Sequence, residues 1–417
     1  MKKVFIFIFI CGFFLKLDSL YGGQSTTLSS LIDEALKNNP QIQAAKARFE
    51  AAKSRVKLLR TLEDPKLEYE YDKITADMDA VMSGKTAPMR TFAVSQEIPF
   101  PTKLFLRKQA AKREANSYEQ EYRETQRGVI KDVKGNYFQL FLSRKKIEVT
   151  KENLGLLGQF VEVTNKKYSV NKATQQDSLK AQVEYSKLSN ELVLLEQEEI
   201  IAKAMLNALL NRQQDTEIVI PEEKNYRHRD LTEEEIVELA RQNRPELKSY
   251  NEMVRKVEID LALAKQEYLP DFMFKYKREE SNGGAGSWAG MFGVTVPLWF
   301  WEKQNSFVKE AKANSEVAKA EYRAEENTVL FESRSAYARF EAAKKLVDIY
   351  ETGVLPQAQA ALETSRRGYE SEKTDFLELL DSLRTMRGFE IEYFEAMANQ
   401  EIALADLERS VGIDLNL

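Results

Sequence analysis

The stretch DPKLEYEYD at residues 64–72 decides the fold, because its side chains alternate between an apolar row and a charged row. Leu67, Tyr69 and Tyr71 form the apolar row, and the residues between them are charged. Strict alternation predicts a strand with one apolar and one polar face. The stretch PDFMFKYK at residues 270–277 repeats the pattern, and its proline lies 205 positions after that of the first stretch. The chain therefore contains two copies of one plan.

Each strand leads into a second alternating stretch, so two β-hairpins are expected, at about 65–98 and 270–297. In the first hairpin a polar loop with Gly84 and Pro88 precedes the second strand. The strands have about eight to ten residues, which is the length that a tilted strand needs to cross a bilayer. Four strands cannot close a barrel, and open strand edges are not tolerated in lipid. If these strands span a membrane, several chains must share one transmembrane β-barrel, and three chains would supply twelve strands.

Prolines mark the joints of the repeat. They are Pro40, Pro65 and Pro99 in the first copy, and Pro245, Pro270 and Pro297 in the second. The first member of each set opens a charged, alanine-rich helical stretch, where a proline in the first turn sacrifices no hydrogen bond. The predicted structural repeats cover residues 23–212 and 230–417, and residues 213–229 form the linker between them.

A helical hairpin follows each β-hairpin, at about 103–211 and 302–411. From Lys103 to Tyr168 no proline interrupts the helical pattern, which predicts a helix of roughly 100 Å. Pro356 predicts a local kink in the second long helix. The helices are charged nearly all round, which favours a wall with water on both sides, as in a hollow cylinder. Apolar residues that recur every seven positions are typical of a coiled-coil seam, and here they are Val133, Leu140, Ile147, Leu154, Val161 and Tyr168.

The N-terminus has the layout of a targeting signal. Lys2 and Lys3 precede an apolar run that is too short to span a membrane, so residues 1–22 are predicted to be a secretory signal peptide. Cys11, the single cysteine, lies inside that run, and the residues before it are bulkier than a lipidation signal requires.

A formal net charge of −5 argues against a nucleic-acid partner, because nucleic-acid-binding proteins carry a clustered basic surface.

Neither catalysis nor metal binding is expected from the residue inventory. His228 is the single histidine and lies in the linker, so a Ser-His-Asp triad, a metal site and a bound cofactor are not predicted. Met78, Met82 and Met89 fall in the expected first hairpin loop, where methionines could bind a soft cation such as Cu(I). Their irregular spacing is more typical of ordinary loop residues.

Four stretches carry a resemblance to a known family, and they read EALKNNPQIQAAKARFEAAKSRV, VSQEIPFPTKLFLRKQA, YSVNKATQQDSLKAQVEY and YESEKTDFLELLDS. Over about residues 28–412 the chain resembles the TolC-like outer-membrane efflux channels. The segment Pro-Phe-Pro-Thr-Lys at 99–103 is similar to their CzcC/CusC-like metal-efflux branch. The resemblance implies a homotrimer with a long periplasmic α-helical barrel and a β-barrel in outer-membrane lipid. It implies a passive exit duct that works with a periplasmic adaptor protein and an inner-membrane transporter of the RND type.

The resemblance also implies that function concentrates at the two helical-hairpin tips. The expected adaptor-docking residues are Asn171, Lys172, Ala173 and Thr174 in the first tip, and Glu372, Lys373 and Thr374 in the second. The family has a glycine at each tip turn, where this chain has Asn171 and Glu372. Glutamate tolerates the left-handed conformation poorly, so the second turn is expected to differ from the family's geometry.

The entrance of the channel is expected to be narrowed by Glu378 and Asp381, which correspond to acidic residues of the family. Their spacing of three places both carboxylates on one helix face, and a ring of such acids favours cations. Their counterparts in the first repeat are Asp177 and Lys180, and Tyr369 corresponds to a tyrosine that holds the entrance closed. Two competing interpretations need no gate. The acids would lie on an ordinary solvent-exposed helix face, and Tyr369 would pack in the seam between helices.

Two other functions fit parts of the sequence. A periplasmic coiled-coil adaptor or scaffold protein would share the long helices, but its β-domains need more than four strands to bury a core. A duct for type I protein secretion would share the whole architecture, because the pump selects the cargo. The aromatic rows of the strands favour a lipid-facing band and hence an outer-membrane duct.

Overall fold

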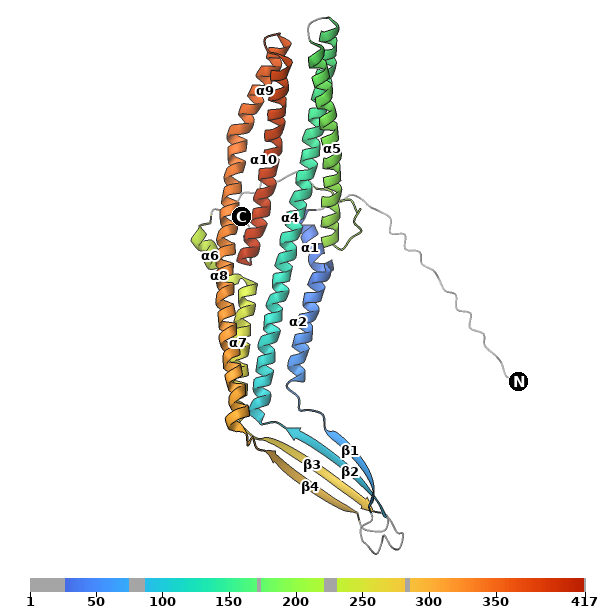
Figure 1. Ribbon diagram of the computed structural model, residues 1–417, viewed down its shortest axis with the longest axis vertical. Helices are drawn as coiled ribbons and strands as arrows, with labels where there is room; N and C mark the ends of the chain where they lie inside the picture. Colours follow the sequence, from blue (N-terminus) through green and yellow to red (C-terminus); the bar gives the residue numbers. More distant parts are fainter. Residues whose placement is uncertain (1–26, 75–86, 171–173, 221–230, 282–285, 416–417) are drawn as a thin grey trace, which may run out of the picture.

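The computed structural model describes residues 27–74, 87–170, 174–220, 231–281 and 286–415. The molecule is long and narrow, with a small sheet at one end and two helical-hairpin turns at the other (Figure 1). This mainly helical architecture with four strands confirms the predicted fold class. The predicted signal peptide with Cys11, as well as Met78, Met82 and His228, lies outside the described residues.

Four antiparallel strands form one sheet in the order β1-β2-β3-β4. They are β1 (Lys66–Ile74), β2 (Ala87–Ile98), β3 (Asp271–Ser281) and β4 (Ser287–Thr295). Tyr69 lies opposite Phe92, and Phe274 lies opposite Phe292, so the apolar rows of all four strands share one face. Leu67 on that face is 80% exposed, which shows that the face has no core to cover it within one chain.

The strand β2 begins earlier than the sequence predicts. Pro88 was expected in the loop, but it lies in β2 and pairs with Lys73 of β1. The pairing of β2 with β3 begins only at Met89, so Pro88 has a single neighbouring strand among the described residues. A proline without an N–H is tolerated at such an edge position. Met89 is likewise a strand residue, which corrects its assignment to the loop.

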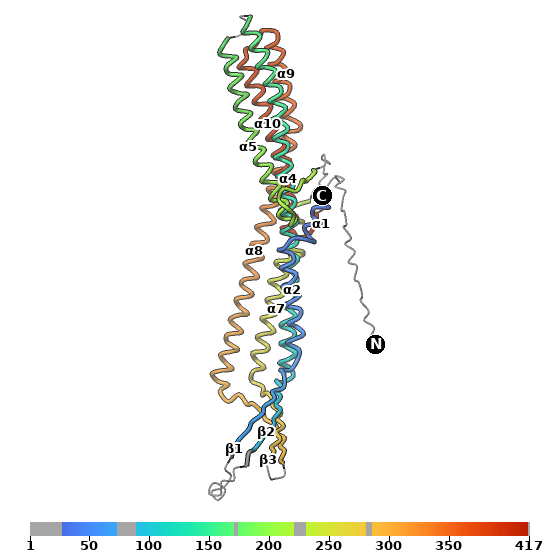
Figure 2. The backbone as a smooth tube through the Cα atoms, turned by 90° about the vertical axis from the view of Figure 1, so that its right-hand side faces the viewer, coloured from blue at the N-terminus to red at the C-terminus, as the bar shows by residue number. Residues whose placement is uncertain are grey.

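The helices form a wall in which short helices are stacked in pairs beside long ones. The first repeat has α1 (Leu28–Asn38), α2 (Pro40–Leu58), α4 (Pro101–Ser169) and α5 (Gln175–Leu209). The second has α6 (Glu233–Asn243), α7 (Pro245–Gln266), η1 (Phe300–Gln304), α8 (Asn305–Ile349), η2 (Tyr350–Val354), α9 (Leu355–Glu370) and α10 (Phe376–Val411). Figures 1 and 2 show α2 below α5 and α7 below α10, with α4 and α8 running alongside. Among the described residues, no helix is apolar over a length that could cross a membrane.

The residue before the first proline of each repeat, Pro40 or Pro245, ties the stacked helices together. Asn39 caps α2 and donates from Nδ2 to the Leu209 carbonyl at the end of α5, at 2.9 Å. In the second repeat Arg244 donates from Nη1 to the Arg409 carbonyl near the end of α10, also at 2.9 Å. Arg244 is 2% exposed and also bonds to Glu332 of α8. Both repeats therefore connect their stacked helices through the residue before the proline, which is an asparagine in the first repeat and an arginine in the second.

Apolar packing follows the predicted seam along most of α4. Val133 and Leu140 are fully buried in a cluster that includes Leu31 of α1 and Leu206 of α5. The prediction is wrong at Tyr168, which is 44% exposed because the seam ends before the tip.

The irregularity predicted at Pro356 takes the form of a π-helical turn. The segment η2 directly precedes α9, and Pro356 lies in the first turn of α9. Proline has no N–H to donate to the carbonyl one turn before it in the helix, and the wider π-helical turn accommodates this carbonyl.

Candidate functional site

The turn between α9 and α10 forms the tip of the second helical hairpin. The backbone N–H groups of Lys373 and Thr374 donate to the Gly368 carbonyl, at 2.8 and 3.3 Å. Glu372 adopts a left-handed conformation with φ of 61°, although its Cβ makes this conformation unfavourable by about 1–2 kcal/mol. The turn is thus closed with glutamate in the left-handed position. A Cβ at Gly368 would lie 2.7 Å from the ends of the Thr374 side chain, so any larger residue here requires Thr374 to move.

Glu378 and Asp381 lie on the first turns of α10 and are both exposed. The N-cap of this helix is Asp375, whose Oδ1 accepts from the Glu378 backbone N–H at 2.8 Å. Within the described residues the carboxylate of Glu378 makes no hydrogen bond or ion pair. The two acids are therefore available to solvent on one face of the helix.

In the first tip the corresponding acid, Asp177, is hydrogen-bonded at the start of its helix. Asn171, Lys172 and Ala173 lie outside the described residues. Thr174 and Asp177 form a capping box at the start of α5, in which Asp177 Oδ2 accepts from the Thr174 N–H at 3.1 Å and from its hydroxyl at 2.7 Å. The counterparts of this pair, 201 positions later, are Asp375 and Glu378. Asp375 accepts from the Glu378 N–H, but the Glu378 carboxylate accepts no bond in return among the described residues, and the two carboxylates repel each other.

Tyr369 lies inside the contact between the two hairpins. Its side chain is 8% exposed, and its ring meets that of Phe376 edge to face with centroids 5.9 Å apart. Lys167 of α4 donates to the Tyr369 carbonyl at 3.0 Å and places its ammonium 4.1 Å from the ring centroid. The hydroxyl lies 3.4 Å from that of Thr164. Tyr369 is thus positioned to hold α9 and α10 against α4.

Two ion pairs tie α5 to α10 below the tips. Arg384 binds both carboxylate oxygens of Glu184, with its Nε at 2.7 Å, and Arg387 binds both oxygens of Glu191 at 2.8 Å. Sequence reasoning missed these pairs as well as the Lys167 contact. The separations of the paired residues, 200 and 196 positions, do not match the repeat offset of 201, so the repeat alone does not predict these pairs.

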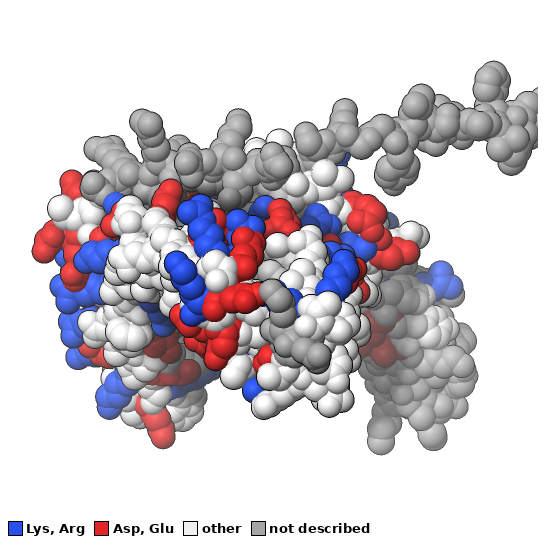
Figure 3. Space-filling model, turned by 90° about the horizontal axis from the view of Figure 1, so that it is seen from above, with Lys and Arg blue, Asp and Glu red and all other residues white. Residues whose placement is uncertain are grey.

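The surface around the tips is electrostatically mixed. Figure 3, which looks down on them, shows acidic and basic side chains interspersed with neutral ones. Among the described residues, no group of three or more His, Cys, Asp or Glu side chains could hold a metal ion.

The sequence model of the outer membrane efflux protein family matches residues 31–212 and 236–413 of this chain, one segment for each repeat. The chain belongs to this family. It is 22% identical to the outer membrane protein TolC of Vibrio cholerae over 92% of this chain and 90% of that protein. Its fold matches the outer-membrane channel OprN with a TM-score of 0.81 and 16% identity, over 94% of this chain and 91% of that one. It matches CusC with a TM-score of 0.78 and 16% identity, over 93% of this chain and 92% of that one.

Membership of the family sets the biological context. The protein is an outer-membrane channel with a long periplasmic helical part, and it is a passive duct rather than an enzyme. It acts as a homotrimer, as the exit duct of a tripartite efflux pump with a periplasmic adaptor and an inner-membrane RND transporter. This excludes the alternative of a periplasmic adaptor or scaffold.

Proposed function

We propose that the start of α10 forms a cation-favouring gate at the periplasmic entrance of this duct, lined by Glu378 and Asp381. The observation that carries the proposal is the change of N-cap from Thr174 in the first repeat to Asp375 in the second. Among the described residues, the Glu378 carboxylate accepts no hydrogen bond from Asp375, whereas the Asp177 carboxylate accepts two from Thr174. Three copies would bring six such carboxylates around one axis, and rings of carboxylates select cations in channels. Asp177 remains a candidate lining residue, although its Oδ2 already accepts two hydrogen bonds.

In this proposal the gate is held shut by the contacts between the two hairpins of each chain. Tyr369 packs between α4 and α10, and the Arg384–Glu184 pair ties α5 to α10. Opening requires α9 and α10 to move away from α4 and α5, and a docked adaptor could supply the energy for this movement. The tip turns, at residues 171–174 and 372–374, are the proposed docking points, and the exposed Lys373 is accessible to a partner.

The cargo that the gate favours is cationic. Metal cations and small toxic organic cations both meet this requirement, and the inner-membrane pump chooses between them. The fold does not favour the metal-efflux branch, because OprN matches it at least as well as CusC does.

The test is ion selectivity in planar lipid bilayers. The double variant Glu378→Gln with Asp381→Asn keeps the side-chain shapes and removes the charges, so the reversal potential in a KCl gradient should shift towards zero. Block by multivalent cations from the periplasmic side should weaken as well. The matched control is Glu351→Gln, an exposed acid of η2 far from the tip, which should behave as the wild type. Wild-type selectivity and block in the double variant would contradict the proposal.

A further inference from the structure

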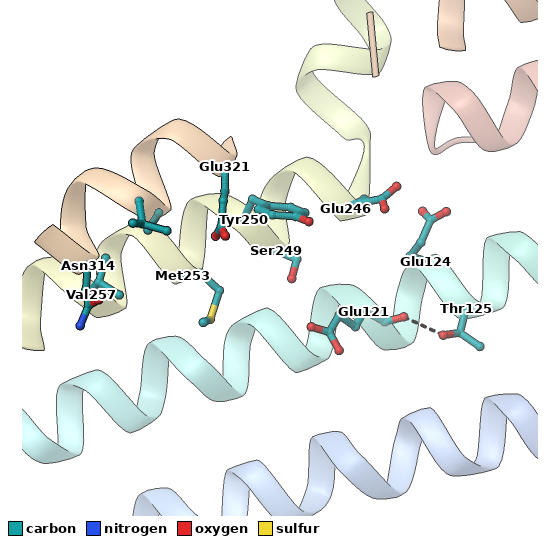
Figure 4. A pocket seen from close by; sticks show the side chains of 12 residues that line it. Glu121, Glu124, Thr125, Glu246, Ser249, Tyr250, Met253, Val257, Asn314 and Glu321 are labelled. Carbon is teal, nitrogen blue, oxygen red and sulfur yellow. Dashed lines mark hydrogen bonds between the residues drawn. The ribbon is translucent and has the colours of Figure 1, made fainter. Parts of the chain in front are cut away.

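A cavity of about 670 Å³ opens between α4, α7 and α8, below the joint at Arg244 (Figure 4). This volume falls within the range of small-molecule binding sites. Its lining combines two chemistries. Met253, Val257 and Val317 provide an apolar surface, and four glutamates with the phenol of Tyr250 provide a polar one.

The cavity lies on one particular face of the helical wall. Its α8 residue Glu321 is thirteen positions from Arg334, which pairs with Glu233 at the start of α6. At about 100° per residue these two side chains point to nearly opposite sides of α8. On α4, the cavity residues Thr125 and Glu121 point about 160° and 120° away from Arg127, which binds Asp414 near the C-terminus, whereas Glu124 lies at the edge of the cavity, about 60° from Arg127.

The face that carries α6 and the C-terminal residues must be the outer one if three chains enclose a duct, because a lumen filled with these elements would be blocked. The cavity then opens towards the lumen. This step rests on the proposed function, since only a duct has a lumen to keep open.

Two of the four glutamates of the cavity have counter-charges, because Glu246 pairs with Arg244 at 3.0 Å and Glu124 pairs with Arg409. Glu121 and Glu321 form no ion pair within the described residues, and both are exposed. Glu124 binds Arg409 at 3.0 Å, but its second oxygen, Oε2, is buried and has no hydrogen-bond partner in the described part of the chain. Burial raises the pKa of Glu124, which means that the site disfavours an uncompensated negative charge.

Tyr250 faces several of these acids at once. Burial and the nearby carboxylates, among them Glu325, Glu246 and Glu321, raise the pKa of its hydroxyl. No hydrogen bond from this hydroxyl occurs among the described residues. An aromatic ring beside unpaired carboxylates and an apolar floor is the combination that recognises organic ammonium ions.

We propose that this cavity binds amphiphilic organic cations on their way through the duct, with the apolar body against Met253 and Val317 and the positive charge between Glu121 and Glu321. A hydrated metal ion fits the cavity poorly, because hard cations need several converging oxygen ligands rather than an apolar floor. A neutral or anionic compound of the same shape would lack the attraction of the carboxylates. The site thus deepens the proposed function by naming a class of cargo.

The test is binding of tetraphenylphosphonium to the purified trimer in lipid nanodiscs, measured by equilibrium dialysis at low salt. Tetraphenylborate, which has the same shape and the opposite charge, is the matched probe. Binding to empty nanodiscs of the same lipid is subtracted, because the interfacial dipole potential of the lipid favours the hydrophobic anion. After this subtraction we expect tetraphenylphosphonium to bind more tightly than tetraphenylborate. The double variant Glu121→Gln with Glu321→Gln should weaken tetraphenylphosphonium binding roughly threefold to tenfold, because each exposed carboxylate contributes about what a surface ion pair does. Glu316→Gln, an exposed acid of α8 outside the cavity, should leave binding unchanged.

Equal binding of the two probes, or equal loss in the double variant and in Glu316→Gln, would overturn the inference. Planar-bilayer conductance of the same preparation separates the two proposals. A trimer that conducts selectively but does not bind tetraphenylphosphonium overturns the cavity inference and leaves the gate intact. A trimer that binds tetraphenylphosphonium through Glu121 and Glu321 supports the cavity even if its cation selectivity does not depend on the tip acids.

Discussion

Replacing Tyr369 with alanine should loosen the second hairpin tip and raise the resting conductance of the channel. The side chain is 8% exposed, and removal of a buried aromatic ring typically costs about 3–5 kcal/mol. The contact with the Lys167 ammonium, at 4.1 Å from the ring centroid, adds about 0.5–1 kcal/mol at a partly exposed site. Tyr369→Phe should cost about 0.5 kcal/mol or less, because the hydroxyl contact to Thr164 is long, at 3.4 Å.

Hydrogen exchange and bilayer recordings measure the two consequences of this change. Amide protection in α9 and in the first turns of α10 should fall about a hundredfold or more in the alanine variant, because each 1.4 kcal/mol of local stability corresponds to a factor of ten. The single-channel conductance of that variant should rise, whereas Tyr369→Phe should resemble the wild type in both measurements. Wild-type protection and conductance in Tyr369→Ala would refute the reasoning that this ring holds the tip.

Three further changes test other parts of the structure. Gly412→Ala should lower the thermal stability of the trimer by about 1–3 kcal/mol, since φ is 81° there and a Cβ would lie 2.9 Å from a backbone oxygen. Lys103→Met should destabilise the junction of helix and strand by about 3–5 kcal/mol and expose it to protease, because the 1% exposed ammonium binds Asp271 at 3.0 Å. The pKa of Glu184 lies below its ordinary value of 4.5 because Arg384 donates to it, so this pair stabilises the tip above that pH. Protection factors near the tip, which correct for the intrinsic pH dependence of amide exchange, should therefore fall as the pH falls through the lowered pKa, and Arg384→Met should remove that pH dependence.

The features that sequence reasoning predicted well are set by local physics. Alternation fixed both faces of the sheet, because strand side chains must point in opposite directions in turn. The unbroken run after Lys103 became the single helix α4, since no proline or glycine pair interrupts its hydrogen bonds. Prolines at matching positions identified the joints of the repeat. None of these conclusions required knowledge of which elements lie side by side.

The features that were missed depend on tertiary neighbours. Pro88 is tolerated in β2 only because β3 has not yet begun to pair beside it. Tyr168 fits the heptad pattern but lies beyond the packed part of the seam, and Tyr369 is buried only because α4 supplies Lys167 and Thr164 across the hairpins. Packing partners of this kind cannot be deduced from periodicity.

The repeat explains why the proposed gate is asymmetric. Both hairpin tips start their second helix with an N-cap residue followed three positions later by an acid, but the first cap is Thr174 and the second is Asp375. In the first tip the Thr174 hydroxyl donates to Asp177 in addition to the backbone N–H that closes the capping box, whereas the Asp375 carboxylate cannot donate and repels Glu378. Two differences between the copies, Thr174 against Asp375 and Asp177 against Glu378, thus distinguish a structural carboxylate in the first tip from an available one in the second. Asp381 then stands where the first repeat has the basic Lys180, so the second copy alone presents two acids on one helix face, and any cation-selective ring must be built mainly from that copy.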